Sequence, residues 1–397
     1  MLIALSQIFP KSLYLHIPFC KRRCFYCDFA ITTGGDRLKQ QYVDVLCQEI
    51  ALTVAATPPV EALQTIFFGG GTPSLLSVSQ IAQILETIAK YFAIAPDAEI
   101  SLEANAGTVS LESLQGYRSL GINRISLGAQ AFQQELLDVC GRGHTVAEIY
   151  ETVALFKLAG FENFNLDLIA GLPHQSMADW QDSIHQAIAL QPNHLAVYDL
   201  TIEEGTAFAK RYQAGETPLP TDSLTVEMYL AAHELLPSAG YEHYEISNYA
   251  RSGYQVQHNL TYWHNQPFYG MGMGATSYLD RQRIDRPQKM RAYLDAMARW
   301  QAEGIGFTVP ILSDSEALMD TLMQGLRLAE GVSLNSLRQS YGDLLCDRAL
   351  QILEKYIDRG WVKLIDLGND SQIFLTAPDG WLFSDVAIAD LYENLIP

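Results

Sequence analysis

The chain has 397 residues, 48% of them hydrophobic, which is typical of a folded globular protein with one large and one smaller domain. Its 26 lysine and arginine residues face 45 aspartate and glutamate residues, and the resulting net charge of −19 argues against nucleic acid as the main partner. The sequence shows no apolar run that could span a membrane and no signal-peptide pattern, so we expect a cytoplasmic protein without a transmembrane segment.

Short β-rich segments alternate with amphipathic segments through the first half of the chain. We expect strands at residues 12–17, 65–68, 99–103, 124–127, 163–169 and 194–200, and helices at 37–55, 79–92, 110–119, 146–159 and 177–190. This alternation predicts repeated βα units on a parallel sheet. Six units are too few for a closed eight-stranded barrel, so the predicted fold is α/β, a partial TIM-type (β/α)6 barrel with its chemistry at the carboxyl ends of the strands.

Three cysteines, Cys20, Cys24 and Cys27, follow the first predicted strand. They can hold three corners of a [4Fe-4S] cluster and leave the fourth iron free for a ligand. A structural zinc site needs four protein ligands, and the sequence offers no fourth cysteine nearby. A Cys3His zinc site with His16 is the alternative, and a disulfide would leave one of the three cysteines unpaired.

Further candidate residues lie at the ends of the other predicted strands. A glycine-rich turn, residues 69–73, follows the second strand and would let the backbone approach a ligand closely, although a plain tight turn is the alternative. The polar candidates are Glu103, Gln130, Arg142 and Asp167. Each alone is more often a solvated or paired residue, but their convergence on one barrel predicts a cage for a zwitterionic ligand.

A break in the pattern near residues 305–315 predicts a boundary between a domain of residues 1–305 and a small domain of residues 306–397. The second domain has predicted helices at 317–326, 334–341 and 347–358, strand-like runs at 362–367 and 372–375, and a last helix from Phe383. This order predicts a winged-helix-like α+β unit. Its basic residues are mixed with acidic ones, so we expect a lid or a protein-contact module and no DNA-binding face.

Together these motifs resemble the radical S-adenosylmethionine (SAM) proteins of the oxygen-independent coproporphyrinogen III oxidase type. The resemblance runs through nearly the whole chain and rests on residues 14–27, the Gly-Gly-Gly-Thr-Pro turn, and residues 103–105, 124–130 and 165–173. It implies a [4Fe-4S] cluster on Cys20, Cys24 and Cys27, whose free iron chelates SAM and whose electron releases a 5′-deoxyadenosyl radical. By motif position, Gly70, Gly71 and Thr72 would hold the methionine end, Glu103 its amino group, and Gln130, Arg142 and Asp167 the rest. Tyr14 and Tyr26 would flank the cluster, with Tyr26 either stacked on adenine or shielding the cluster.

Two departures separate this sequence from the oxidases of that family. Phe29 stands where the oxidases carry a fourth cysteine, and only 19 residues precede Cys20. Both departures resemble the heme chaperone branch, whose members bind heme and deliver it to apo-hemoproteins. A second motif of that branch, His258-Asn-Leu-Thr-Tyr262-Trp263, makes His258 a candidate heme ligand, with a hydrogen-bonded packing role as the alternative.

The sequence thus favours a heme chaperone that binds heme, a [4Fe-4S] cluster and SAM, with an apo-hemoprotein client and a one-electron donor protein as partners. The alternative is a radical SAM oxidoreductase that decarboxylates coproporphyrinogen III, which the complete SAM site favours; whether the protein is an enzyme depends on this choice. The resemblance also implies a monomer–dimer equilibrium.

Overall fold

The computed structural model describes residues 9–304, 306–307, 309–368 and 370–396. Six parallel strands lie side by side in chain order, and they confirm the predicted parallel sheet. They are β1 (Ser12–Ile17), β2 (Leu63–Gly70), β3 (Ile94–Asn105), β4 (Arg124–Gln130), β5 (Asn163–Ala170) and β6 (His194–Asp199). Apolar residues of these strands, such as Leu13, Leu15 and Ile66, are fully buried, because helices cover one face of the sheet.

Three shorter strands extend the sheet beyond the prediction. β9 (Tyr269–Met271) pairs parallel with β1, while β8 (Asn248–Ala250) pairs antiparallel with β6 and with β7 (Glu242–Glu245). The sheet order is therefore β7-β8-β6-β5-β4-β3-β2-β1-β9. Its two edge strands do not pair with each other among the described residues, so the sheet stays open.

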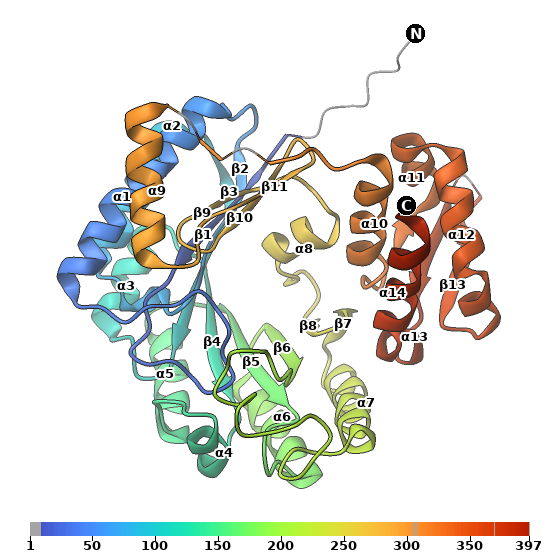
Figure 1. Cartoon of the computed structure of the whole chain (residues 1–397). Helices are drawn as coiled ribbons and strands as arrows, with labels where there is room; N and C mark the ends of the chain where they lie inside the picture. Colours follow the sequence, from blue (N-terminus) through green and yellow to red (C-terminus); the bar gives the residue numbers. More distant parts are fainter. Residues whose placement is uncertain (1–8, 305, 308, 369, 397) are drawn as a thin grey trace.

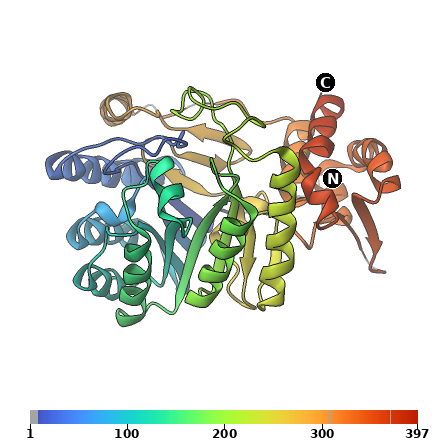
Figure 2. The same cartoon turned by 90° about the horizontal axis from the view of Figure 1, so that it is seen from below.

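The predicted helices of the first half are confirmed within one or two residues. They are α1 (Asp36–Ala56), α2 (Val78–Tyr91), α3 (Leu111–Ser119), α5 (Val146–Leu158) and α6 (Met177–Leu190), and they lie along the outer face in Figures 1 and 2. Four of them begin with a capping box, with Ser77, Ser110, Thr145 and Ser176 as N-caps. The short α4 (Gln134–Val139) and the long α7 (Asp222–Ser238) were not predicted.

Residues 251–304 add α8 (Gln257–Trp263), the hairpin β10 (Thr276–Leu279) and β11 (Gln282–Asp285), and α9 (Met290–Glu303). α9 packs beside α1 (Figure 1). α8 contacts β2 on one side and α10 (Asp314–Gly325) on the other, so it lies between the sheet and the C-terminal helices.

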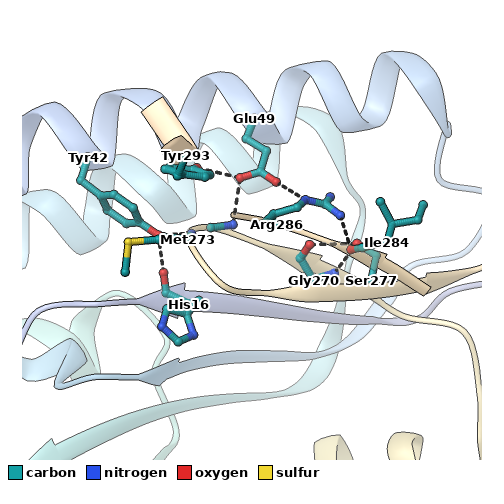
Figure 3. A network of polar contacts seen from close by, with 10 residues as sticks. His16, Tyr42, Glu49, Gly270, Met273, Ser277, Ile284, Arg286 and Tyr293 are labelled. Carbon is teal, nitrogen blue, oxygen red and sulfur yellow. Dashed lines mark hydrogen bonds and ion pairs between the residues drawn. The ribbon is translucent and has the colours of Figure 1, made fainter. Parts of the chain in front are cut away.

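A buried network, drawn in Figure 3, fastens this segment to the start of the chain. Glu49 of α1 pairs with Arg286 at 2.7 Å and accepts hydrogen bonds from the Tyr293 hydroxyl and the Gly272 amide. Tyr42 of α1 accepts a hydrogen bond from the Met273 amide and donates one to the His16 carbonyl. The end of β1, four residues before Cys20, is thereby held from the side of β9.

The C-terminal elements have a hydrophobic core of their own, to which Tyr229 of α7 contributes. Besides α10 they are α11 (Leu334–Tyr341), α12 (Asp343–Asp358), α13 (Asp379–Leu382) and α14 (Ser384–Leu395), with a sheet of order β12-β14-β13. β13 (Val362–Asp366) and β14 (Ser371–Leu375) confirm the predicted hairpin, and β12 (Val332–Ser333) adds a third strand. Residues 305 and 308, at the predicted boundary, lie outside the described residues. Among the described helices, none combines the length and the apolar character needed to cross a membrane.

Candidate functional site

A cavity of about 310 Å³ lies at the carboxyl ends of the parallel strands, and we call it the upper cavity. It brings together every predicted cofactor residue except Tyr14 and His258. These lining residues are Cys20, Cys24, Tyr26, Cys27, Gly70, Gly71, Thr72, Glu103, Gln130, Arg142 and Asp167. The groups come from five different strands or the loops that follow them, as expected for a parallel sheet.

The three cysteines lie in the loop after β1, which we call the cysteine loop (residues 18–32). Its ends are joined by hydrogen bonds from the Cys20 amide to the Thr32 carbonyl and from the Thr32 amide to the Pro18 carbonyl. All three thiols are free and half-buried, and burial raises the pKa of Cys20 and brings that of Cys27 to about 11. Binding to iron would replace these protons, because the thiolate is the metal ligand.

His16 does not face the cysteines as a fourth ligand would. Its Nε2 lies 2.8 Å from the Ala30 carbonyl oxygen and its Nδ1 lies 3.1 Å from the Tyr14 hydroxyl. With both ring nitrogens engaged, the Cys3His zinc alternative gains no support from the geometry. The imidazole instead ties β1 to the far end of the cysteine loop.

The glycine-rich turn packs directly against the cysteine loop. The amides of Gly71 and Thr72 donate to the carbonyls of Ile17 and Phe19 at 2.9 and 2.8 Å. A Cβ on Gly71 would lie 2.8 Å from the Phe19 oxygen, and Gly70 has a φ of +104°. These glycines are therefore required for the close approach of the two loops.

Two carboxyl groups face the upper cavity without a cationic partner in hydrogen-bonding contact. Burial, with a smaller contribution from the charge on Asp167, raises the pKa of Glu103 to about 8, although its Oε2 accepts a hydrogen bond from the Gly70 amide. Burial raises the pKa of Asp167 to about 6 despite hydrogen bonds from Asn165 and Ser126. A ligand with ammonium and sulfonium groups would stabilise both carboxylates, so this part of the cavity fits SAM.

The side chain of Arg142 contacts both the cysteine loop and the carboxyl ends of neighbouring strands. Its Nη1 lies 3.6 Å from Cys24 Sγ, and its Nη2 donates to Asn105 Oδ1 at 2.5 Å and to the Gly128 carbonyl at 2.8 Å. Its Nε is buried without a partner among the described residues. The neighbouring Gln130 has a φ of +72° at a bulge of β4, a strained conformation of the kind found at binding sites.

A second cavity of about 200 Å³, the lower cavity, lies deeper between the strands. Glu103 and Asp167 line both cavities, whereas Tyr14 and His258 line only the lower one, so the structure does not place Tyr14 in the upper cavity with Tyr26. His258 is 1% exposed, and its Nδ1 and Nε2 each lie 2.7 Å from a hydroxyl oxygen, those of Thr65 and Tyr262. Burial lowers its pKa to about 3, so the imidazole is neutral at physiological pH.

A third cavity of about 470 Å³, the outer cavity, is lined by the aromatic side chains of Tyr262, Trp263 and Phe268 and by Gln324 of α10. Tyr198 at the end of β6 lines all three cavities. The sequence analysis missed Tyr198, Asn105 and the lower-cavity residue Arg124. Asn105 and Arg124 lie within motif segments of the sequence, but no sequence signal distinguishes Tyr198 from an ordinary strand residue.

Comparison with known proteins agrees with this geometry. Residues 14–187 match the profile of the radical SAM superfamily. The chain is 41% identical to the heme chaperone HemW of Synechocystis sp., over 98% of each chain, and 33% identical to that of Bacillus subtilis, over 96% of this chain and 100% of the relative. The solved structure of the coproporphyrinogen III oxidase HemN from Escherichia coli superposes with a TM-score of 0.81 at 23% identity, covering 97% of this chain and 90% of the other.

Proposed function

The chain belongs to the heme chaperone HemW family of radical SAM proteins, and on that premise we propose that it binds heme and delivers it to an apo-hemoprotein. The observation that carries the proposal is the upper cavity, which gathers the cysteines, the glycine-rich turn and the two carboxyls. Phe29, 59% exposed at the rim of this cavity, stands where the oxidases carry a fourth cysteine and favours the chaperone branch.

We assign the cofactors to the upper cavity by residue. Cys20, Cys24 and Cys27 would hold a [4Fe-4S] cluster, and the fourth iron would take the amino and carboxylate groups of SAM. When bound, the reduced cluster supplies one electron to the sulfonium of SAM. The SAM contacts would come from Gly70, Gly71, Thr72, Glu103, Gln130, Arg142 and Asp167, with Tyr26 beside them.

The heme site is proposed at the outer cavity, where Tyr262, Trp263 and Phe268 offer aromatic faces to a macrocycle. His258 lines the lower cavity and not the outer one, and it stays the candidate iron ligand because its imidazole is neutral. Its Nε2 is bonded to the Tyr262 hydroxyl, so ligation would require that Tyr262 move away. A client hemoprotein, a one-electron donor, a cytoplasmic location and a monomer–dimer equilibrium complete the proposal.

Anaerobic heme titration of cluster-loaded protein, followed by absorption spectroscopy, tests this function. We expect stoichiometric binding with an imidazole-ligated spectrum that the His258→Ala variant loses. His194→Ala is the matched control, since His194 is also buried beside the lower cavity with both ring nitrogens hydrogen-bonded. Absence of heme binding, together with formation of vinyl product from coproporphyrinogen III, would instead identify a radical SAM oxidoreductase.

A further inference from the structure

Arg124, the first residue of β4, is an unpaired buried cation in the lower cavity. It is 2% exposed, and its Nε is buried without a hydrogen-bond partner. No hydrogen bond or ion pair joins its guanidinium to any residue in the described part of the chain. Arginine is almost never buried in this way unless an anion or a set of acceptors satisfies its five N–H donors.

The two acids that line the lower cavity interact with Arg124 through charge alone: its positive charge lowers the pKa of both Glu103 and Asp167, but neither carboxyl group forms a hydrogen bond or ion pair with the guanidinium. The Asp167 carboxylate accepts hydrogen bonds from Asn165 and Ser126, and Glu103 accepts one from the Gly70 amide. Asn165 Oδ1 forms a hydrogen bond of 2.6 Å with His194 Nδ1. The acids that share this cavity therefore accept hydrogen bonds from other donors, and the guanidinium lines the cavity without a hydrogen-bond partner in the described part of the chain.

We infer that Arg124 anchors a binding site for a carboxylate in the lower cavity. The planar guanidinium matches the two oxygens of a carboxylate in a bidentate pair. The nearby carboxylate of Asp167 favours a monoanion over a doubly charged phosphate, because it would repel each added negative charge. Neutral side chains, among them Tyr14 and Ser126, complete the wall around the site.

The ligand would enter through the outer cavity. The lower and outer cavities share the lining residues Tyr198, Asn248, Asn259 and Tyr262, so the two spaces adjoin. A free small carboxylic acid could occupy the lower cavity alone. Alternatively, the carboxylate arm of a larger ligand could reach Arg124 while its aromatic body lies between Trp263 and Phe268 in the outer cavity; heme, with its propionates, has this chemistry.

Propionate is the first probe, measured by calorimetric titration on the full-length, cluster-loaded chain. We expect propionate to bind and its neutral analogue propionamide not to bind, and Arg124→Gln to weaken propionate at least about tenfold. Arg291→Gln is the matched control, because Arg291 is an exposed arginine of α9 that lines none of the three cavities. It should leave propionate binding within twofold.

Heme and its dimethyl ester, compared on the unsubstituted protein, distinguish the two sources of the carboxylate. Weaker binding of the ester by tenfold or more assigns the site to a propionate arm, whereas equal binding with propionate still recognised assigns it to a free acid. The inference would be overturned if propionamide bound with the same affinity as propionate. It would also be overturned if Arg124→Gln, with a native circular dichroism spectrum, bound propionate as tightly as the unsubstituted protein. Failure of heme to bind at all would contradict the proposed function but leave the propionate result to decide this site.

Discussion

Burial of Glu103 destabilises the unliganded folded protein by an amount that depends on pH. Burial and the charge on Asp167 raise its pKa to about 8, from an ordinary value of 4.5. Between these values the folded state binds a proton that the unfolded state has released, so the stability from this group is complete below pH 4.5 and is lost as pH rises through 8. A cationic ligand such as SAM would offset the cost by stabilising the carboxylate.

We predict that Glu103→Gln changes how the free energy of unfolding depends on pH, relative to the unsubstituted chain. The neutral amide avoids ionisation, so the variant should gain about 1 kcal/mol per pH unit relative to the parent between pH 5.5 and 7.5. Urea denaturation of both proteins without cofactors, at three pH values in this window, measures the difference. A difference that is constant with pH would show that Glu103 is already ionised.

The cysteines and the glycine-rich turn of the upper cavity were predictable because they form motifs that are local in sequence. Cys20, Cys24 and Cys27 fall within eight residues, and the glycine-rich turn is a continuous segment. Arg124 and Tyr198 gain their significance only from side chains of other strands that enclose the lower cavity. A single sequence does not encode which distant residues share a cavity.

At the scale of elements, the support of the cysteine loop comes from residues more than 200 positions away. Glu49, fully buried on α1, joins Arg286 and Tyr293 and holds the Gly272 amide, while Tyr42 holds Met273 and the His16 carbonyl (Figure 3). Removal of one partner from a buried ion pair leaves an uncompensated charge and costs about 3–5 kcal/mol.

We therefore expect Glu49→Leu and Arg286→Met each to lower the free energy of unfolding by about 3–5 kcal/mol, and the double variant to lose less than the sum. Arg291→Ala is the matched control: Arg291 and Asp295 form an exposed pair at 3.8 Å, so its loss should change stability by less than about 0.5 kcal/mol. Chemical denaturation of the unsubstituted chain, the two single variants and the double variant completes the cycle. Additive losses would mean that Glu49 and Arg286 act independently.

Separation along the chain also explains which helices and strands could be predicted from the sequence. The predicted bounds of β1 coincide with those observed, and β5 and β6 differ by one residue, because buried parallel strands between amphipathic helices carry a strong local pattern. β8 and β9 have three residues each, which is too short for any periodicity, and β9 joins β1 across more than 250 positions. Their existence depends on tertiary pairing, and sequence patterns alone do not show it.

At the scale of the molecule, the C-terminal elements form one wall of the outer cavity. Gln324 of α10 lines it, and the segment after α8 is joined to this unit by hydrogen bonds from His264 to Glu330 at 2.7 Å and from Asn265 to Thr321 at 2.9 Å. The lid or protein-contact role of residues 306–397 stays a prediction.

The three cavities meet at Tyr198, and the upper and lower ones share Glu103 and Asp167, which couples their ligands through charge. SAM carries a net positive charge near neutral pH. Bound in the upper cavity, it would compensate the carboxylate of Asp167, which with a pKa of about 6 is ionised near neutral pH and repels a carboxylate ligand beside Arg124. SAM should therefore raise the affinity of the lower cavity for propionate about fivefold or more, and propionate should raise the affinity for SAM by the same factor, because binding linkage is reciprocal.

Calorimetric titration of propionate with and without SAM measures this coupling, and titration of SAM with and without propionate checks its reciprocity. S-adenosylhomocysteine is the matched control ligand, since it has the same adenosine and amino acid groups without the sulfonium charge. Enhancement by SAM but not by S-adenosylhomocysteine would trace the coupling to the charge facing Glu103 and Asp167. Equal propionate affinity with the two ligands would contradict electrostatic coupling between the two cavities.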